Sequence, residues 1–244
     1  MLELKHVSYA VPKENNSAES KEILNDVSLT VQERFVAITG PNGGGKSTLA
    51  RLIAGIYRPT EGEIFLDGQN ITDLSITERA KLGIGFAFQQ PVRFKGLTVN
   101  DLITLAAGRK LTITEACEYL SEVGLCARDY IHREVNASLS GGELKRIEIA
   151  TILARNTKLS VFDEPEAGID LWSFNNLISV FEKLYDKVKG TILIISHQER
   201  ILNIADKIIV VADGKICASG TKEEVLPSLL NSSSVCPTLM DKLS

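Results

Sequence analysis

The stretch "RFVAITGPNGGGKSTLARLIAGI", residues 34–56, runs from an apolar segment through a glycine-rich loop into a helical pattern. Its centre, "GPNGGGKST" at residues 40–48, fits the pattern G-x-x-x-x-G-K-[ST] of a phosphate-binding loop. In that pattern, bare backbone N–H groups and a helix N-terminus surround the anion. Lys46 then reaches the terminal phosphates, and the Ser47 hydroxyl ligates Mg²⁺. These residues predict a strand, a phosphate loop and a helix, in that order.

Apolar runs alternate with helical patterns along most of the chain. Further strands are predicted at 83–89, 159–164, 191–196 and 207–214. The last three are nearly continuous apolar runs, which is typical of parallel strands buried on both faces. Helical patterns at 171–188 and 198–205 lie between them, so we expect α/β organisation. The glycine-bounded segment "GEIFLDG", residues 62–68, is expected to form a short strand in a hairpin or at a sheet edge.

Residues from about 98 to 137 have a different pattern, because helical segments follow one another with no strand between them. We expect a helical subdomain inserted into one α/β domain that covers residues 1–244, with the core at 1–97 and 138–230. The polar segment 12–20 is expected to be a mobile loop, and residues 231–244 a weakly ordered tail.

Composition excludes several classes of protein. The net charge is −4 and there is no long basic run, so we expect no nucleic acid partner. The apolar runs are too short to span a bilayer, and the start "MLELKHVSYAV" lacks the features of a signal peptide. The four cysteines form no CxxC pair, so we expect reduced structural thiols in a cytoplasmic protein.

A pair of acidic residues follows the apolar run in "LSVFDEPEAGID", residues 159–170. A strand that ends at Asp163 would place a carboxylate beside the phosphate loop, where it can hold Mg²⁺. Glu164 comes next and suits a general base that orients water against the γ-phosphate.

Two adjacent glycines open a helical pattern in "SLSGGELKRIEI", residues 138–149. Ser140 and Glu143 form a capping-box pattern, so we expect a long amphipathic helix to start here. A cap does not require Gly141 and Gly142, which are unfavourable inside a helix. Bare backbone at a helix start suits the close approach of a second anion.

Together these motifs resemble the ABC-type ATPases over nearly the whole chain. The resemblance rests on the phosphate loop (Walker A), Gln89 in "FAFQQP" (Q-loop), "LSGGE" at 139–143 (signature), and the Walker B pair. It also rests on Tyr9, on "AGID" at 167–170 (D-loop) and on His197 in "IISHQ" (switch). The resemblance implies a P-loop NTPase core of the ABC ATPase type, with an antiparallel β subdomain and an inserted helical subdomain.

The resemblance also implies a role for each motif residue in an ATP hydrolase that uses ATP and Mg²⁺. Two copies of the chain would pack head to tail, and the signature of one would cap the γ-phosphate bound to the other. Nucleotide binding is assigned to Tyr9, Gly40, Pro41, Asn42, Gly43, Gly44, Gly45, Lys46, Ser47 and Thr48. Contact with the ATP bound to the other copy of the chain is assigned to Leu139, Ser140, Gly141, Gly142 and Glu143. Mg²⁺ is assigned to Ser47, Gln89 and Asp163, and catalysis to Glu164, His197 and Gln89.

Within this family, residues around the signature are most similar to SufC, the ATPase of iron–sulfur cluster assembly. The shared pattern spans "REVNASLSGGELKRIEI" (133–149) and "ERAKLGIGFAFQQPV" (78–92), although Leu139 replaces a phenylalanine. That similarity implies a SufB-type scaffold as partner. The segments "IYRPTEGEI" and "DEPEAG" instead look like transporter ATPases, for which the partner is a transmembrane permease and the location peripheral to the membrane. In both cases we expect the partner to dock near residues 90–137.

Overall fold

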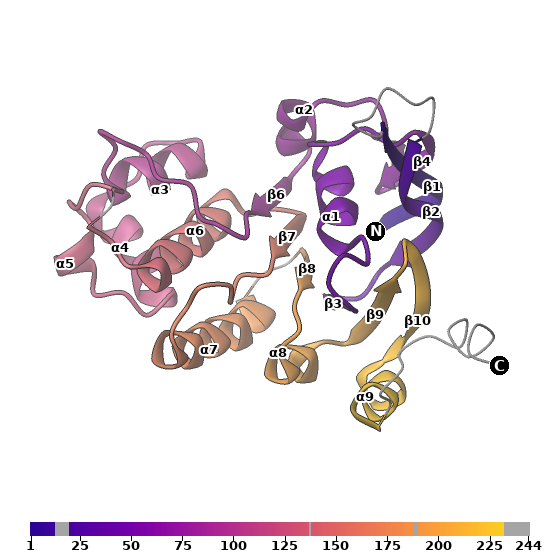
Figure 1. Cartoon of the computed structure of the whole chain (residues 1–244). Coiled ribbons are helices and arrows are strands. Elements are labelled where there is room, and N and C mark those ends of the chain that lie inside the picture. Colours follow the sequence, from indigo (N-terminus) through magenta and orange to yellow (C-terminus); the bar gives the residue numbers. More distant parts are fainter. Residues whose placement is uncertain (13–19, 137, 188–189, 232–244) are drawn as a thin grey trace. The chain divides into compact units, whose positions relative to one another are not determined.

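The computed structural model describes residues 1–12, 20–136, 138–187 and 190–231. The chain forms two compact units, one of Met1–Leu82 and Leu193–Ser244 and the other of Gly83–Ile192. Figure 1 labels the helices and strands of both units. The expected tail at 231–244 and the expected loop at 12–20 fall almost wholly outside the described residues.

The first unit contains an antiparallel sheet of β1 (Leu2–Pro12), β2 (Ser20–Val31), β4 (Glu61–Leu66) and β5 (Gln69–Asn70). The strand order is β2-β1-β4-β5. Leu2 pairs with Val31 on one side and with Leu66 on the other, and all three side chains are buried. The segment that was predicted as a short hairpin strand is β4, and the turn to β5 passes through Gly68, whose φ is 80°. The expected antiparallel β subdomain is therefore confirmed.

The same unit contains parallel strands that carry the phosphate loop. β3 (Phe35–Thr39) pairs in parallel with β9 (Lys207–Ala212), and β10 (Lys215–Thr221) pairs antiparallel with β9. Every residue of β3 is buried, as expected for a strand covered on both faces. The helices are α1 (Lys46–Ala54), α2 (Ile76–Lys81), α8 (Glu199–Ile204) and α9 (Lys222–Asn231).

The second unit combines two parallel strands with a group of helices. β6 (Ile84–Ala87) pairs in parallel with β7 (Leu159–Asp163), and β8 (Thr191–Ile195) begins at the end of this unit. The helices are α3 (Val99–Ala107), α4 (Ile113–Glu122), α5 (Ala127–Tyr130), α6 (Gly141–Arg155) and α7 (Leu171–Lys187). The first three lie where the sequence predicted helices without strands. Across the described parts of the chain, no helix combines the length and apolar character needed to cross a membrane.

Two sequence predictions about this unit were wrong in detail. β6 ends at Ala87 rather than at residue 89, because the main chain of Phe88 bonds to side chains of α6 and not to a strand. α6 is also not amphipathic, since its buried residues occur around most of its circumference. The reason is that α6 contacts α3, α4, α7 and β6, and Figure 1 shows α3 and α4 beside it. A helix enclosed on several sides has no polar face to expose.

Candidate functional site

The phosphate loop occupies the turn between β3 and α1. α1 begins at Lys46, and its N-cap residue Gly45 has φ 103° and makes no side-chain capping bond. The first N–H groups of α1 therefore have no side-chain cap, which leaves a helix N-terminus available to an anion. Gly45 is also required by packing, because a Cβ atom there would lie 2.7 Å from Cδ2 of Leu24.

The Lys46 side chain folds back over the loop that precedes it. Its ammonium is buried, and Nζ donates to the carbonyl oxygens of Gly40 and Pro41 at 2.9 Å each. These bonds hold the ammonium at the loop, where a charged oxygen is a stronger acceptor than a neutral carbonyl. A phosphate oxygen is such an acceptor. Ser47 and Thr48 follow in the first turn of α1 and are partly buried.

The predicted adenine-stacking residue Tyr9 lies on β1 and has an aromatic neighbour that the sequence did not reveal. Its ring stacks on Tyr57, with centroids 5.2 Å apart and planes 4° from parallel. Tyr57 is itself fixed by Arg51, whose Nη1 donates to the Tyr57 hydroxyl at 3.1 Å. Since Arg51 lies on α1, the helix that starts at the phosphate loop also supports this aromatic pair.

The predicted switch residue His197 is exposed directly after β8. The N–H of the preceding residue, Ser196, donates to the carbonyl oxygen of Ile38 in β3 at 3.1 Å. This hydrogen bond joins the residue that follows β8 to β3 near its carboxyl end. β3 then continues into the phosphate loop. Ligands of α/β proteins bind at the carboxyl ends of parallel strands. His197, which follows β8, and the phosphate loop, which follows β3, are both in such positions.

The second unit contains the predicted Walker B pair at the end of β7. Asp163 is buried at 1% exposure, and Glu164 adopts a left-handed conformation with φ 46°. A non-glycine residue in that region is uncommon, and strain of this kind is concentrated at functional sites. Gln89 Nε2 donates to Glu164 Oε2 at 2.7 Å, so two residues predicted from separate motifs meet directly.

The donor chemistry of the predicted Mg²⁺ site fits the ion. Asp163 offers a carboxylate, Ser47 a hydroxyl and Gln89 an amide oxygen, and all are the hard oxygen ligands that Mg²⁺ prefers. Among the described residues no group of three or more His, Cys, Asp or Glu side chains forms a metal cage.

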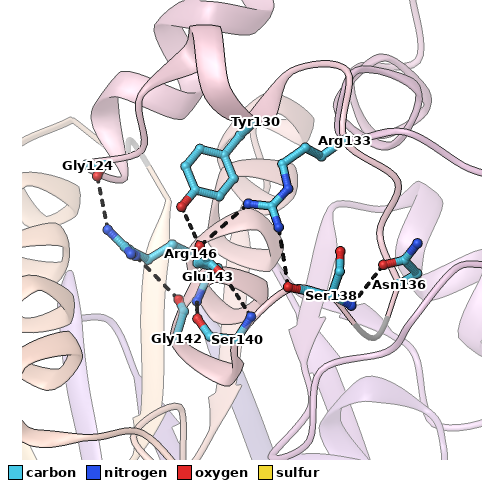
Figure 2. Close-up of polar contacts among 9 residues, drawn as sticks. All are labelled: Gly124, Tyr130, Arg133, Asn136, Ser138, Ser140, Gly142, Glu143 and Arg146. Atoms are coloured by element: carbon cyan, nitrogen blue, oxygen red, sulfur yellow. Dashed lines mark hydrogen bonds and ion pairs between the residues drawn. The ribbon is translucent and has the colours of Figure 1, made fainter.

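The signature residues open α6 and make the predicted capping box (Figure 2). Ser140 Oγ accepts from the N–H of Glu143 at 3.3 Å, while the N–H of Ser140 donates to Glu143 Oε2 at 2.6 Å. The other carboxylate oxygen, Oε1, accepts from the Tyr130 hydroxyl and lies 3.7 Å from Nη1 of Arg133. Partial burial alone would raise the pKa of Glu143, but hydrogen bonds from Tyr130 and Ser140 lower that pKa overall. The carboxylate is thus ionised and surrounded by donors. Tyr130 had no motif to identify it in the sequence.

The two signature glycines differ in what surrounds them. A Cβ atom on Gly142 would lie 2.8 Å from Cβ of Ser173 at the start of α7, so packing requires glycine there. A Cβ atom on Gly141 would have only the carbonyl oxygen of Gly168 nearby, at 3.5 Å. Gly141 is also exposed, so packing gives no reason for its missing side chain. Of the two, Gly141 remains the candidate for close approach to an anion.

Three of the four cysteines lie within the described residues. Cys117, Cys126 and Cys217 form no disulfide there, and Cys236 falls outside the described residues.

Comparison with known proteins is consistent with this geometry. The family model described as "ABC transporter" matches residues 24–167. An uncharacterised ABC transporter ATP-binding protein of Methanocaldococcus jannaschii is 41% identical, over 84% of this chain and 86% of the relative. The lipopolysaccharide export ATP-binding protein LptB of Haemophilus influenzae is 34% identical, over 86% of this chain and 89% of the relative. Among solved structures, the ATP-binding cassette MJ0796, a dimer bound to ADP and Pi, matches with TM-score 0.79 and 28% identity. That match covers 91% of this chain and 99% of the solved chain.

These comparisons bear on the two alternatives that the sequence left open. They give no support to the SufC-like assignment, because these relatives are transporter ATP-binding proteins. The similarity around the signature was therefore too local to identify a branch. The chain belongs to the ABC transporter family, as one of its ATP-hydrolysing cassettes.

Proposed function

We propose that the chain is the ATP-binding subunit of a membrane transporter, which hydrolyses MgATP to drive a transmembrane permease. The SufB-type scaffold of the SufC-like alternative has no support among the relatives, whereas LptB is by name part of an export system. The chain would then lie peripheral to the membrane. Two copies would close head to tail, each contributing a signature to the other's ATP, as the dimeric cassette MJ0796 suggests.

The catalytic roles follow the predicted motifs. Lys46 and the loop backbone would bind the β- and γ-phosphates, while Ser47 and Asp163 hold Mg²⁺. Glu164 would accept a proton from the attacking water as the γ-phosphorus–oxygen bond to ADP breaks, which yields ADP and inorganic phosphate. The bond from Gln89 to Glu164 supports this, since it fixes the carboxylate that must orient the water.

The observation that best supports a permease as the partner is an apolar groove in the second unit. It has a volume of about 240 Å³ and is lined mainly by aromatic and aliphatic side chains, among them Phe86, Phe88, Val92, Phe94 and Leu102. Phe88, Val92 and Phe94 are 40–46% exposed, which is unusual for such large apolar side chains in one place. Two of its lining residues, Phe88 and Val92, flank Gln89 in the sequence. An apolar helical segment of a permease would fill it in the way that amphipathic helices fill apolar grooves.

Membrane recovery tests this function. A tagged chain expressed at its native level should be recovered with membranes and released by detergent together with a multi-span protein. Phe94→Asp should reduce that recovery at least tenfold, because a carboxylate would be buried in the interface. Ile113→Asp is the matched control, since Ile113 is 59% exposed on α4 and does not line the groove. Recovery with a β-rich partner in the absence of membranes would instead restore the SufC-like alternative.

Turnover tests the catalytic roles separately. Glu164→Gln should lower kcat by two or more orders of magnitude while ATP still binds, because only the base is lost. Lys46→Ala should weaken ATP binding, because it removes the charge that meets the terminal phosphates. Wild-type turnover by Glu164→Gln would refute the assignment of the base.

A further inference from the structure

Two oppositely charged side chains lie together on α6, one turn beyond the signature, with Lys145 buried and Glu148 partly buried. Lys145 and Glu148 have side-chain exposures of 2% and 15%, and Lys145 Nζ lies 3.3 Å from Glu148 Oε2. Burial of two charges costs several kcal/mol per ion unless geometry and further hydrogen bonds compensate. A buried pair in this position therefore needs an explanation other than stability.

Both members of the pair bind the main chain of the same residue. The N–H of Phe88 donates to Glu148 Oε1 at 3.1 Å, and Lys145 Nζ donates to the carbonyl oxygen of Phe88. The cation thus holds the acceptor of Phe88 and the anion holds its donor. Phe88 lies at the point where β6 has ended, so these side chains replace the bonds that a neighbouring strand would supply.

The two charges depend on each other. Burial lowers the pKa of Lys145, while Glu148, Asp163 and Glu166 oppose that change through their negative charge. Burial raises the pKa of Glu148, and Lys145 and the N–H of Phe88 oppose it. The removal of one partner would leave the other as an uncompensated buried charge.

We propose that Lys145 and Glu148 are positioning residues that fix the main chain of Phe88 and thereby aim the Gln89 side chain at Glu164. Gln89 follows Phe88 directly, and its amide donates to Glu164 at 2.7 Å. A backbone shift of about 1 Å at Phe88 would break that bond, and misplacement of this size costs up to 100-fold in rate. The inference rests on the proposed role of Gln89 in hydrolysis.

Lys145 and Glu148, which together we call the clamp, lie next to the groove proposed for the partner. Phe88 and Glu148 both line the groove, so a segment that enters it contacts the clamp directly. Occupation of the groove would therefore reach Gln89 through a single residue. Such a function would explain why the chain has this pair despite its cost in stability.

The test replaces both charges by apolar residues of similar size. Lys145→Met with Glu148→Leu removes the clamp without leaving a lone charge, and such replacements are often neutral for stability. We expect kcat to fall at least tenfold with KM for ATP within twofold of the wild type. In a Gln89→Ala background the same double substitution should have no further effect, because its whole effect passes through Gln89.

Arg155→Met is the control, since it removes an exposed positive charge from the far end of the same helix. Any effect of this control should be equal in the Gln89 and Gln89→Ala backgrounds. If the double substitution also lowers kcat by equal factors in both backgrounds, the pair is merely structural and the proposal is overturned. Glu148→Gln, which keeps the shape and removes the charge, should show the same dependence on Gln89 if the double variant does not fold.

Hydrogen exchange at the Phe88 amide gives a readout independent of turnover. The amide should exchange at least tenfold faster in the double variant, because its acceptor at Glu148 has been removed. Unchanged exchange would overturn the clamp. Wild-type turnover by Gln89→Ala would overturn the proposed role of Gln89 instead, and the amide measurement would still decide whether the clamp exists.

Discussion

At the scale of single residues, the ring of Tyr9 has two faces, and Tyr57 covers one of them. We expect adenine to stack on the other face. Tyr57→Leu should raise the Kd for ATP about threefold to tenfold, because a stacked aromatic pair contributes about 0.5–1.5 kcal/mol. The kcat at saturating ATP should not change.

Tyr57→Phe is the matched control for this prediction. It keeps the ring that supports Tyr9 and removes only the hydroxyl that binds Arg51. Nucleotide titration should place its Kd within twofold of the wild type. Equal weakening by Tyr57→Phe and Tyr57→Leu would mean that stacking on Tyr9 contributes nothing.

The residues around the signature show which contacts can be predicted from the sequence and which cannot. The capping box of Ser140 and Glu143 was predictable, because both partners lie within one helical turn. The reason for Gly142 was not, because Ser173 is distant in the sequence and meets it only after α7 packs. The Tyr130 hydroxyl bond to Glu143 was missed for the same reason.

At the scale of elements, a buried arginine closes the end of α1. Arg79, in α2, is 1% exposed and donates to the carbonyl oxygens of Leu52, Ile53, Thr72 and Leu74 at 2.6–3.1 Å. Burial lowers its pKa to about 10. Arg79→Met should cost at least about 2 kcal/mol of unfolding free energy, because several buried carbonyls lose a charged donor.

Urea unfolding checks the Arg79 prediction. Arg58→Met is the control, since Arg58 pairs with Asp73 at 2.6 Å on the surface, with side-chain exposures of 76% and 71%. Surface pairs of this kind are worth at most about 1 kcal/mol. Midpoints that shift equally for the two variants would show that Arg79 does not support α1.

The start of α4 makes a prediction about pH. Hydrogen bonds from Arg109 and from the main chain and hydroxyl of Thr112 lower the pKa of Glu115 from 4.5 to about 2. Because the folded state has the lower pKa, the stabilisation is complete above pH 4.5 and is lost as the pH falls toward 2. Protection factors of the amides in the first turn of α4, taken relative to the intrinsic exchange rate at each pH, should fall across that window. Arg109→Met should raise the pKa of Glu115, and an unchanged titration in this variant would contradict the assignment.

At the scale of the whole molecule, the motifs were predictable and their connections were not. The phosphate loop, the Walker B pair and the strand ends are each defined by a few consecutive residues, whose spacing carries the chemistry. The bond between Gln89 and Glu164 and the early end of β6 depend on contacts between distant segments. The SufC-like branch has no support among the relatives, although Lys145 and Glu148 belong to the segment on which that similarity rested. In the structure they have a local physical role at Phe88.

The last prediction concerns two copies of the chain. Glu164→Gln should accumulate a dimer with ATP and not with ADP, because the signature must reach a γ-phosphate that is no longer cleaved. Gly141→Asp in that background should abolish the dimer, since a carboxylate would face the phosphate. The new side chain fits each monomer, because the nearest atom to a Cβ at Gly141 is the carbonyl oxygen of Gly168 at 3.5 Å.

Gly141→Asn separates charge from size in this experiment, because it has the same shape as the aspartate substitution and no charge. Light scattering with ATP should show a dimer for Glu164→Gln, a monomer when Gly141→Asp is added, and an intermediate population with Gly141→Asn. Loss of the dimer to the same extent with both substitutions would indicate that bulk alone excludes the partner, so that the proximity of phosphate to Gly141 would have to be abandoned. A dimer that persists with Gly141→Asp would place the partner's nucleotide away from the signature altogether.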